Sequence, residues 1–235
     1  MSEHGKTHRS DGVEARNRLL DAALQLFAET GFAKTSTRQI ALAAQVNIAS
    51  ISYYFGDKAG LYRAVFRDPR RKPRLGLTTD ATDAIDARLT DQPGFSLRES
   101  LQGLLVGFTD PLKQGDVMQC CMRLHFREML EPTGVWQEEI DTRIKPAHAA
   151  LVGVLCRHLE VAQADDDVHR LAFSIVGLGI NLFVARDVMQ AIRPELIASD
   201  QAIDDYAQRL VDYALVMVEG EARRRKKIEP VKSKL

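Results

Sequence analysis

The sequence predicts an all-α fold, and three observations support this prediction. Apolar residues recur at spacings of three and four along most of the 235 residues, whereas no stretch shows the sustained alternation of a half-buried strand. Capping residues and glycine stops fall at the ends of the periodic segments. A hydrophobic content of 45% also provides enough apolar surface for a sizeable core.

Four helices are expected in the N-terminal quarter of the chain. The first spans about residues 13–30 and ends at Gly31, a residue type that favours the left-handed backbone of a helix C-terminus. The N-cap residues at 35–37 then open a short helix. A second short helix follows over about 48–55, and a fourth helix carries the apolar positions 61–66.

A segment rich in proline and arginine, residues 68–76, is expected to separate two domains. Longer helices are predicted beyond it, over about 96–109, 115–130, 134–161, 166–191 and 200–222, with a short helix near 80–91. Four prolines are expected to interrupt this region, with a kink or break at the one inside the long 134–161 pattern: Pro111, Pro132, Pro146 and Pro194.

The formal net charge is zero, but the charges are unevenly distributed. The net charge is +2 over residues 1–68, −7 over 69–220 and +5 over 221–235. Basic ends on an acidic body suit a chain that presents its ends to a polyanion, although solvated charge without a partner is the alternative. The basic tail could add nonspecific DNA affinity, but a solubilising end is the favoured interpretation.

Residues 36–58 have the pattern of a helix-turn-helix, two short helices joined by a tight turn. Small residues at the start of the second helix would allow its backbone to approach a major groove. One face is apolar and is expected to form core: Ile40, Ala44, Val46, Ile51 and Phe55. The opposite face can donate hydrogen bonds to phosphates or base edges: Thr37, Arg38, Ser50, Tyr53, Tyr54 and Lys58.

The alternative for this segment is a helical hairpin in which the hydroxyls only cap and the tyrosines only pack. Tyr53 and Tyr54 are adjacent, so they cannot both face the same core from one helix. At least one of them is therefore expected to have another use.

These residues resemble the DNA-binding domain of the TetR family of transcriptional regulators over about residues 14–66. The resemblance is carried by Gly31-Phe32, Thr35-Ser36-Thr37, Ile40-Ala41, Ala44, Val46, Ile51, Tyr54-Phe55, Lys58 and Leu61. It implies a DNA surface made of Thr37, Arg38, Ile48, Ala49, Ser50, Ser52, Tyr53, Tyr54 and Lys58. In this assignment Tyr54 and Lys58 hold phosphates, while Ser50 and Tyr53 lie nearer the bases.

Two positions depart from the family pattern. Gln45 stands in the turn where the family usually has glycine, so a residue with a side chain is expected to adopt a positive φ. Ser52 stands where an aromatic residue is often found, which leaves Tyr53 as the expected aromatic contact. The operator preference therefore cannot be copied from relatives.

The C-terminal region is similar to the CecR-type branch of the family, through Arg127-Glu128, Pro132-Thr133 and Pro146. The resemblance implies an all-α protein with an N-terminal three-helix helix-turn-helix domain and a larger helical ligand-binding and dimerisation domain. We assign these to residues 12–68 and 77–222, with a basic, disordered tail at 223–235. This branch also implies control of drug-sensitivity or export genes.

A small-molecule effector is expected to bind among the middle helices, where methionines could adapt to differing apolar shapes. The candidates serve an ordinary core equally well: Met118, Met122, His125, Phe126, Trp136 and Phe173. Small residues in the 166–191 pattern let helices approach closely and are candidates for a dimer interface: Ser174, Gly177 and Gly179. The resemblance implies a four-helix bundle from the last two long helices of each subunit, and the alternative is packing within one chain.

No cofactor, catalytic site or metal site is expected. The motifs GxGxxG, GxxxxGK[ST] and GxSxG are absent, and Cys121 and His125 share a helix face without an identifiable third ligand. Three cysteines, Cys120, Cys121 and Cys156, suit a reducing cytoplasm as small hydrophobes, with thiol sensing as the alternative. No secretory signal is recognised at the N-terminus. The most apolar run, residues 171–185, would span about 22 Å of a bilayer core about 30 Å thick, so no membrane is expected.

The expected function is therefore that of a homodimeric repressor on double-stranded operator DNA, released by an effector. Repression is favoured over activation because the chain shows no separate module for contacting polymerase. A helical protein-interaction module without sequence-specific DNA binding is the alternative.

Overall fold

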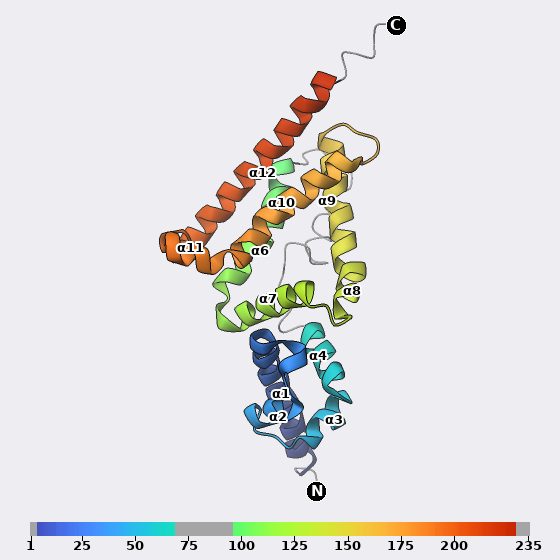
Figure 1. Cartoon of the computed structure of the whole chain (residues 1–235), viewed down its shortest axis with the longest axis vertical. Coiled ribbons are helices and arrows are strands. Elements are labelled where there is room, and N and C mark those ends of the chain that lie inside the picture. The colour runs from blue at the N-terminus through green and yellow to red at the C-terminus, as the bar shows by residue number, and fades with distance from the viewer. Residues whose placement is uncertain (1–3, 69–95, 229–235) are drawn as a thin grey trace. The chain divides into compact units, whose positions relative to one another are not determined.

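The computed structural model describes residues 4–68 and 96–228, and within these ranges it contains helices and no strand, which confirms the predicted all-α class (Figure 1). Contacts divide the chain into two compact units. The first comprises Met1–Pro73 and Gln114–Glu138, and the second comprises Arg74–Lys113 and Glu139–Leu235. The short helix expected near 80–91 and most of the predicted boundary segment lie outside the described residues.

The first unit is built around its longest helix. Its helices are α1 (His4–Lys34), α2 (Thr37–Ala43), α3 (Ala49–Phe55), α4 (Lys58–Arg67), α7 (Gly115–Leu130) and α8 (Val135–Glu139). Helix α1 contacts α2, α3, α4 and α7, and their apolar faces form one core that includes Leu19, Phe27, Ile40, Ile51, Tyr62 and Leu124. Helix α7 thus packs on the N-terminal helices, although the sequence analysis placed it in the C-terminal domain.

Local capping fixes the ends of the short helices in this unit. Gly31 leaves the helical conformation at φ 83° inside the bounds of α1, as expected from its sequence position. The side chain of Ser36 accepts a hydrogen bond from the backbone N–H of Gln39, whose side chain accepts from the backbone N–H of Ser36. Asp57 caps α4 by accepting from the N–H of Gly60 at 2.6 Å.

The second unit is built on three long helices that contact one another. Its helices are α6 (Leu97–Lys113), a π-helix (Ile140–Ile144), α9 (Lys145–His158), α10 (Asp166–Val184), α11 (Arg186–Ile192), a 3-10 helix (Pro194–Ile197) and α12 (Asp200–Ile228). Helices α6, α10 and α12 contact one another, and α9 packs against α6 and α10. Phe108 of α6 is 2% exposed within this core.

Proline and backbone geometry divide the C-terminal helices differently from the sequence prediction. Pro111 lies inside α6, two residues before its end at Lys113. Its missing N–H removes one backbone hydrogen bond there, and the last turn of the helix still forms. The long 134–161 pattern is interrupted by the π-helix, which directly precedes α9 and its first-turn Pro146, while the backbone stays helical on both sides. The 166–191 pattern is two helices, since the backbone of Ala185 departs from helical values at φ −97° and ψ 10°.

The expectation of a disordered tail from residue 223 was wrong for the part that the structure describes. Helix α12 continues to Ile228, and its basic residues pair with acids near the start of α10. Arg225 binds the Asp165 carboxylate through two contacts of 2.7 and 2.9 Å, and Arg224 pairs with Asp167 and Glu221. Residues 229–235 lie outside the described residues.

Helix α10 is the one described helix that is long and apolar enough to cross a membrane by length and composition alone, and 39% of that stretch is buried within the protein. One such helix is weak support for a membrane span, because a core helix passes the same test. Its buried residues, including Val168, Ala172, Ile175 and Leu182, belong to the core of the second unit. We therefore interpret α10 as a core helix with a second apolar face.

Candidate nucleic-acid interface

Helices α2 and α3 are locked together through their buried sides. Ile40, Ala44 and Ile51 are 0%, 3% and 2% exposed, as the apolar pattern predicted. The N–H of Val46 donates to the carbonyl of Ala41 at 3.1 Å and closes the turn. The side chain of Asn47 then accepts from the N–H of Ala49 at 2.8 Å, which starts α3 in a fixed direction.

The two adjacent tyrosines of α3 have different surroundings. Tyr53 is 82% exposed, while Tyr54 is half-buried, and their rings meet edge to face at 4.8 Å between centroids. The hydroxyl of Tyr54 comes close to Gly12 of α1. Tyr53 is therefore free to contact a partner, and the hairpin alternative, in which both tyrosines pack, does not describe this helix.

The remaining predicted residues of the helix-turn-helix lie on α2, on α3 and in the turn between them. Ala49 and Ser52 of α3 and Ile48 before it are exposed, Ser50 is partly exposed, and Arg38 is exposed on α2 beside the half-buried Thr37. The structure thus brings these residues to one helix-turn-helix. Leu42 was not predicted, yet it is 79% exposed and lies four residues after Arg38 on the same face of α2. The spacing of four residues between Arg38 and Leu42 is the sequence feature that could have identified Leu42 as part of this surface.

Lys58 begins α4, and its side chain is held over an aromatic ring. The ammonium lies 4.5 Å from the ring centroid of Phe32, within the range of a cation–π contact. This leaves the charge at the N-terminus of α4, where a phosphate would also meet the helix dipole.

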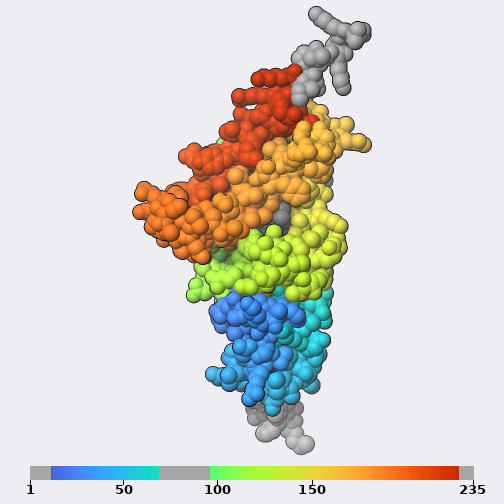
Figure 2. Space-filling model, in the orientation of Figure 1, coloured from blue at the N-terminus to red at the C-terminus, as the bar shows by residue number. Residues whose placement is uncertain are grey.

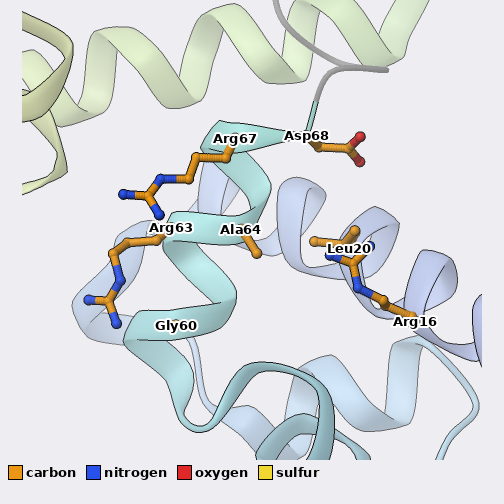
Figure 3. A pocket seen from close by; sticks show the side chains of 7 residues that line it. All are labelled: Arg16, Leu20, Gly60, Arg63, Ala64, Arg67 and Asp68. Carbon is orange, nitrogen blue, oxygen red and sulfur yellow. The ribbon is translucent and has the colours of Figure 1, made fainter. Parts of the chain in front are cut away.

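An open pocket of about 270 Å³ lies between α1 and α4 (Figure 3). It is lined by Arg16, Leu20, Gly60, Arg63, Ala64, Arg67 and Asp68. The guanidinium of Arg16 lies 5.3 Å from the ring centroid of Phe55, and that of Arg67 binds Glu138 at 2.7 and 2.8 Å. The charge of Arg67 is thus paired with an acid, and no part in DNA binding is assigned to this pocket.

Two family descriptions match adjoining parts of the chain. Residues 19–65 match "Bacterial regulatory proteins, tetR family", and residues 97–220 match "HTH-type transcriptional dual regulator CecR, C-terminal domain". The HTH-type transcriptional regulator BetI of Escherichia coli (strain K12 / DH10B) is 30% identical over 164 residues, which cover 69% of this chain and 79% of BetI. The chain belongs to the TetR family. It is thus a DNA-binding transcriptional regulator.

Solved structures share the fold of this TetR-family protein. A TetR-like regulator from Rhodococcus sp. RHA1 has a TM-score of 0.53 at 22% identity, and covers 86% of this chain and 96% of its own. The SmeT–triclosan complex has a TM-score of 0.58 at 18% identity, and covers 86% and 90%. Both likenesses agree with the predicted arrangement of a helix-turn-helix and a C-terminal helical domain.

The predicted effector residues have mixed surroundings in this TetR-family protein. Met118, Met122 and His125 are buried on α7, where Met118 joins the core with α1. The Nδ1 of His125 lies 2.9 Å from the carbonyl oxygen of Cys121, four residues earlier. Phe126 and Trp136 are partly exposed, and Phe173 is 63% exposed and stacks on the ring of His148 at 4.4 Å. Phe173 belongs to the second unit, whereas the other five residues belong to the first.

The predicted dimer residues fall on different faces of α10. Ser174 is exposed and Gly177 partly exposed, but Gly179 is buried against Phe108. A Cβ at position 179 would come within 2.5 Å of that ring, so glycine is needed here for packing within the chain. The prediction that Gly179 lies at a dimer interface was wrong, because Gly179 packs inside its own chain.

The cysteines are free thiols in the described structure. Burial raises the pKa of the Cys120 and Cys156 thiols, which reduces the reactive thiolate at neutral pH. Cys121 is buried in the core with α1. These surroundings favour a structural role. Over residues 4–68 and 96–228, no group of three or more His, Cys, Asp and Glu side chains could hold a metal ion.

Proposed function

We propose that this TetR-family regulator is a repressor that binds a palindromic operator as a homodimer and releases it when a small molecule binds. The observation that supports this most directly is Tyr53, 82% exposed on a helix fixed from behind by Ile51. A large aromatic side chain facing water on a rigid, short helix suits insertion into a major groove.

Each exposed residue has a role that its chemistry supports. Tyr54 and Lys58 are proposed to hold phosphates, while Ser50 and Tyr53 approach base edges. Arg38 and Thr37 of α2 would contact the DNA phosphates and nearby base edges. The unpredicted Leu42 offers an apolar surface for a thymine methyl group. The small side chains of Ala49 and Ser52, beside Ile48, would let the helix approach closely.

A second copy of the chain is proposed to cover the outer face of α10 and α12, which lie side by side (Figure 2). Apolar side chains on this pair of helices are exposed in the single chain: Phe173, Val184, Tyr213 and Val216. Large exposed apolar residues are expected at interaction surfaces. Two such pairs would form a four-helix bundle, with Ser174 and Gly177 at the contact, and leave two recognition helices about 34–36 Å apart on the DNA.

The effector is proposed to be a small, largely apolar molecule bound in the C-terminal domain. In support, SmeT, a solved structure with this fold, is a complex with triclosan. Met118, Met122, His125, Phe126 and Trp136 remain candidates, and all five lie in the part of the chain that matches the CecR C-terminal domain. An effector that binds more tightly to a splayed conformer would shift the population away from operator spacing. No cofactor is needed for this function.

Gel-shift titration against the DNA that flanks the protein's own gene tests the proposal. The wild type should give a salt-sensitive shift that unrelated DNA competes for poorly. Tyr53→Ala and Arg38→Ala should each weaken the shift by about tenfold or more. Arg193→Ala provides a matched control, since this exposed arginine lies in the second unit, beside Glu195. A wild type without any sequence-selective shift would instead support a helical protein-interaction module.

A further inference from the structure

Glu128 of α7 is a fully buried carboxylate with donors from three directions. It is 0% exposed, and the hydroxyl of Tyr62 on α4 donates to it at 2.7 Å. The backbone N–H and the hydroxyl of Thr133 donate at 2.7 and 3.0 Å, and the N–H of Trp136 donates at 3.2 Å. A buried carboxylate is stable only with such partners, so Glu128 joins α4 to α7 and to the loop that follows it.

Tyr62 is the part of α4 that this carboxylate holds. Burial, followed by the hydrogen bond to Glu128, raises the pKa of Tyr62 far above its usual value, so its hydroxyl stays protonated and remains the donor. Its ring packs against three others, with centroids 4.9 Å from Phe27, 5.0 Å from Phe32 and 5.1 Å from Phe66. The hydroxyl therefore fixes the tyrosine inside an aromatic cluster that leaves it little freedom to turn.

The outer member of this cluster is the ring under the Lys58 ammonium. Phe32 follows Gly31, whose left-handed backbone turns the chain out of α1. It is half-buried, with the Lys58 ammonium 4.5 Å from its centroid and the Tyr62 ring edge to face with it at 5.0 Å. A continuous series of contacts therefore leads from the buried carboxylate to a cation at the start of α4.

We propose that Glu128, Tyr62 and Phe32 are positioning residues for the Lys58 ammonium, so that operator affinity depends on a buried carboxylate that does not touch DNA. This inference rests on the proposed function, in which Lys58 binds a phosphate. The aromatic support holds the ammonium where the phosphate will lie, which lowers the conformational entropy lost on binding.

The Arg67–Glu138 pair provides an internal comparison. It also joins α4 to α8, but its side chains are 63% and 48% exposed. An exposed ion pair contributes little to stability. Arg67→Gln removes this second link and leaves the aromatic support intact, so it serves as the control variant.

The test measures operator affinity over a range of salt concentrations for Lys58→Ala, Tyr62→Phe and the double variant. Loss of one phosphate contact per subunit should lower the slope of log K against log salt by about 1.8 for the dimer. Tyr62→Phe removes only the hydroxyl and should weaken operator binding about threefold or more. In that background Lys58→Ala should cost clearly less affinity than in the wild type, because the support of the ammonium is already weakened. Arg67→Gln should match the wild type.

The results test the phosphate contact of Lys58 separately from the positioning of its ammonium by Tyr62. If Lys58→Ala leaves the wild-type slope unchanged, Lys58 is not a phosphate contact, and both its proposed role and the inference fall. If it lowers the slope but costs the same factor in the wild type and in the Tyr62→Phe background, the inference is wrong while the proposed function stands. A variant that only lowers the folded fraction would weaken binding equally at every salt concentration. Should Tyr62→Phe not fold, Phe32→Leu replaces it, since this change removes the ring under Lys58 and keeps the buried hydrogen bond.

Discussion

The backbone of Gln45 is left-handed, with φ 54°, in the turn between α2 and α3. Glycine adopts this conformation without steric cost, whereas a residue with a Cβ is strained by about 1 kcal/mol. The side chain of Gln45 is exposed, so the strain is not offset by burial. The departure from the family pattern at this residue therefore has a measurable cost in stability.

Gln45→Gly should raise the free energy of unfolding by about 0.5–1 kcal/mol, because the strain is relieved while part of the gain is lost to greater freedom of the unfolded chain. Chemical denaturation monitored by circular dichroism measures this change. Gln45→Ala is the matched control and should give no gain, since alanine keeps the Cβ. An equal stabilisation by both variants would show that the glutamine side chain, and not the backbone, is unfavourable.

Helix α10 illustrates how one element can use small residues for different purposes. Gly179 is buried against Phe108 of α6, whereas a Cβ at Gly177 would meet nothing within 4 Å. Both glycines look alike in the sequence, and both were assigned to an interface. Only the first has its small size explained by the packing of the single chain.

Gly179→Ala should destabilise the protein by about 1–3 kcal/mol, because its Cβ would overlap the Phe108 ring in a tightly packed core. Gly177→Ala should not destabilise the subunit, since alanine is the better helix former and the space is open. Thermal denaturation of the two variants compares them directly. Equal melting temperatures for both would contradict the packing assigned to Gly179.

Both units expose charged and apolar side chains, and different uses are proposed for them. Tyr53 and Arg38 are exposed on the helix-turn-helix of the first unit, while Phe173, Val184, Tyr213 and Val216 are exposed on α10 and α12 of the second. The basic end of α12 is partly neutralised by Asp165 and Asp167. This ion pairing supports the interpretation that the C-terminal charge contributes less to DNA binding than its net value suggested.

Val216→Glu should convert the proposed dimer into monomers, because Val216 is 66% exposed on α12 and a partner would bury the new charge. Light scattering coupled to size-exclusion chromatography measures the mass. Operator affinity should fall together with dimerisation, since a palindrome needs two recognition helices. Val117→Glu makes the same change at a valine that is 55% exposed on α7, and it should leave the mass unchanged. A Val216→Glu protein of unchanged mass would place the interface elsewhere.

The amino-acid sequence was sufficient to predict the helical class, the helix-turn-helix, the positive φ of Gln45 and the family. These follow from apolar spacing, caps and short motifs, which act between residues close in the chain. Three-dimensional packing was needed to show that α7 lies on α1, that Gly179 faces Phe108 and that Glu128 accepts from Tyr62. Each of these depends on contacts between residues distant in sequence, and a periodic pattern shows that a helix has an apolar face without showing which helix will cover it.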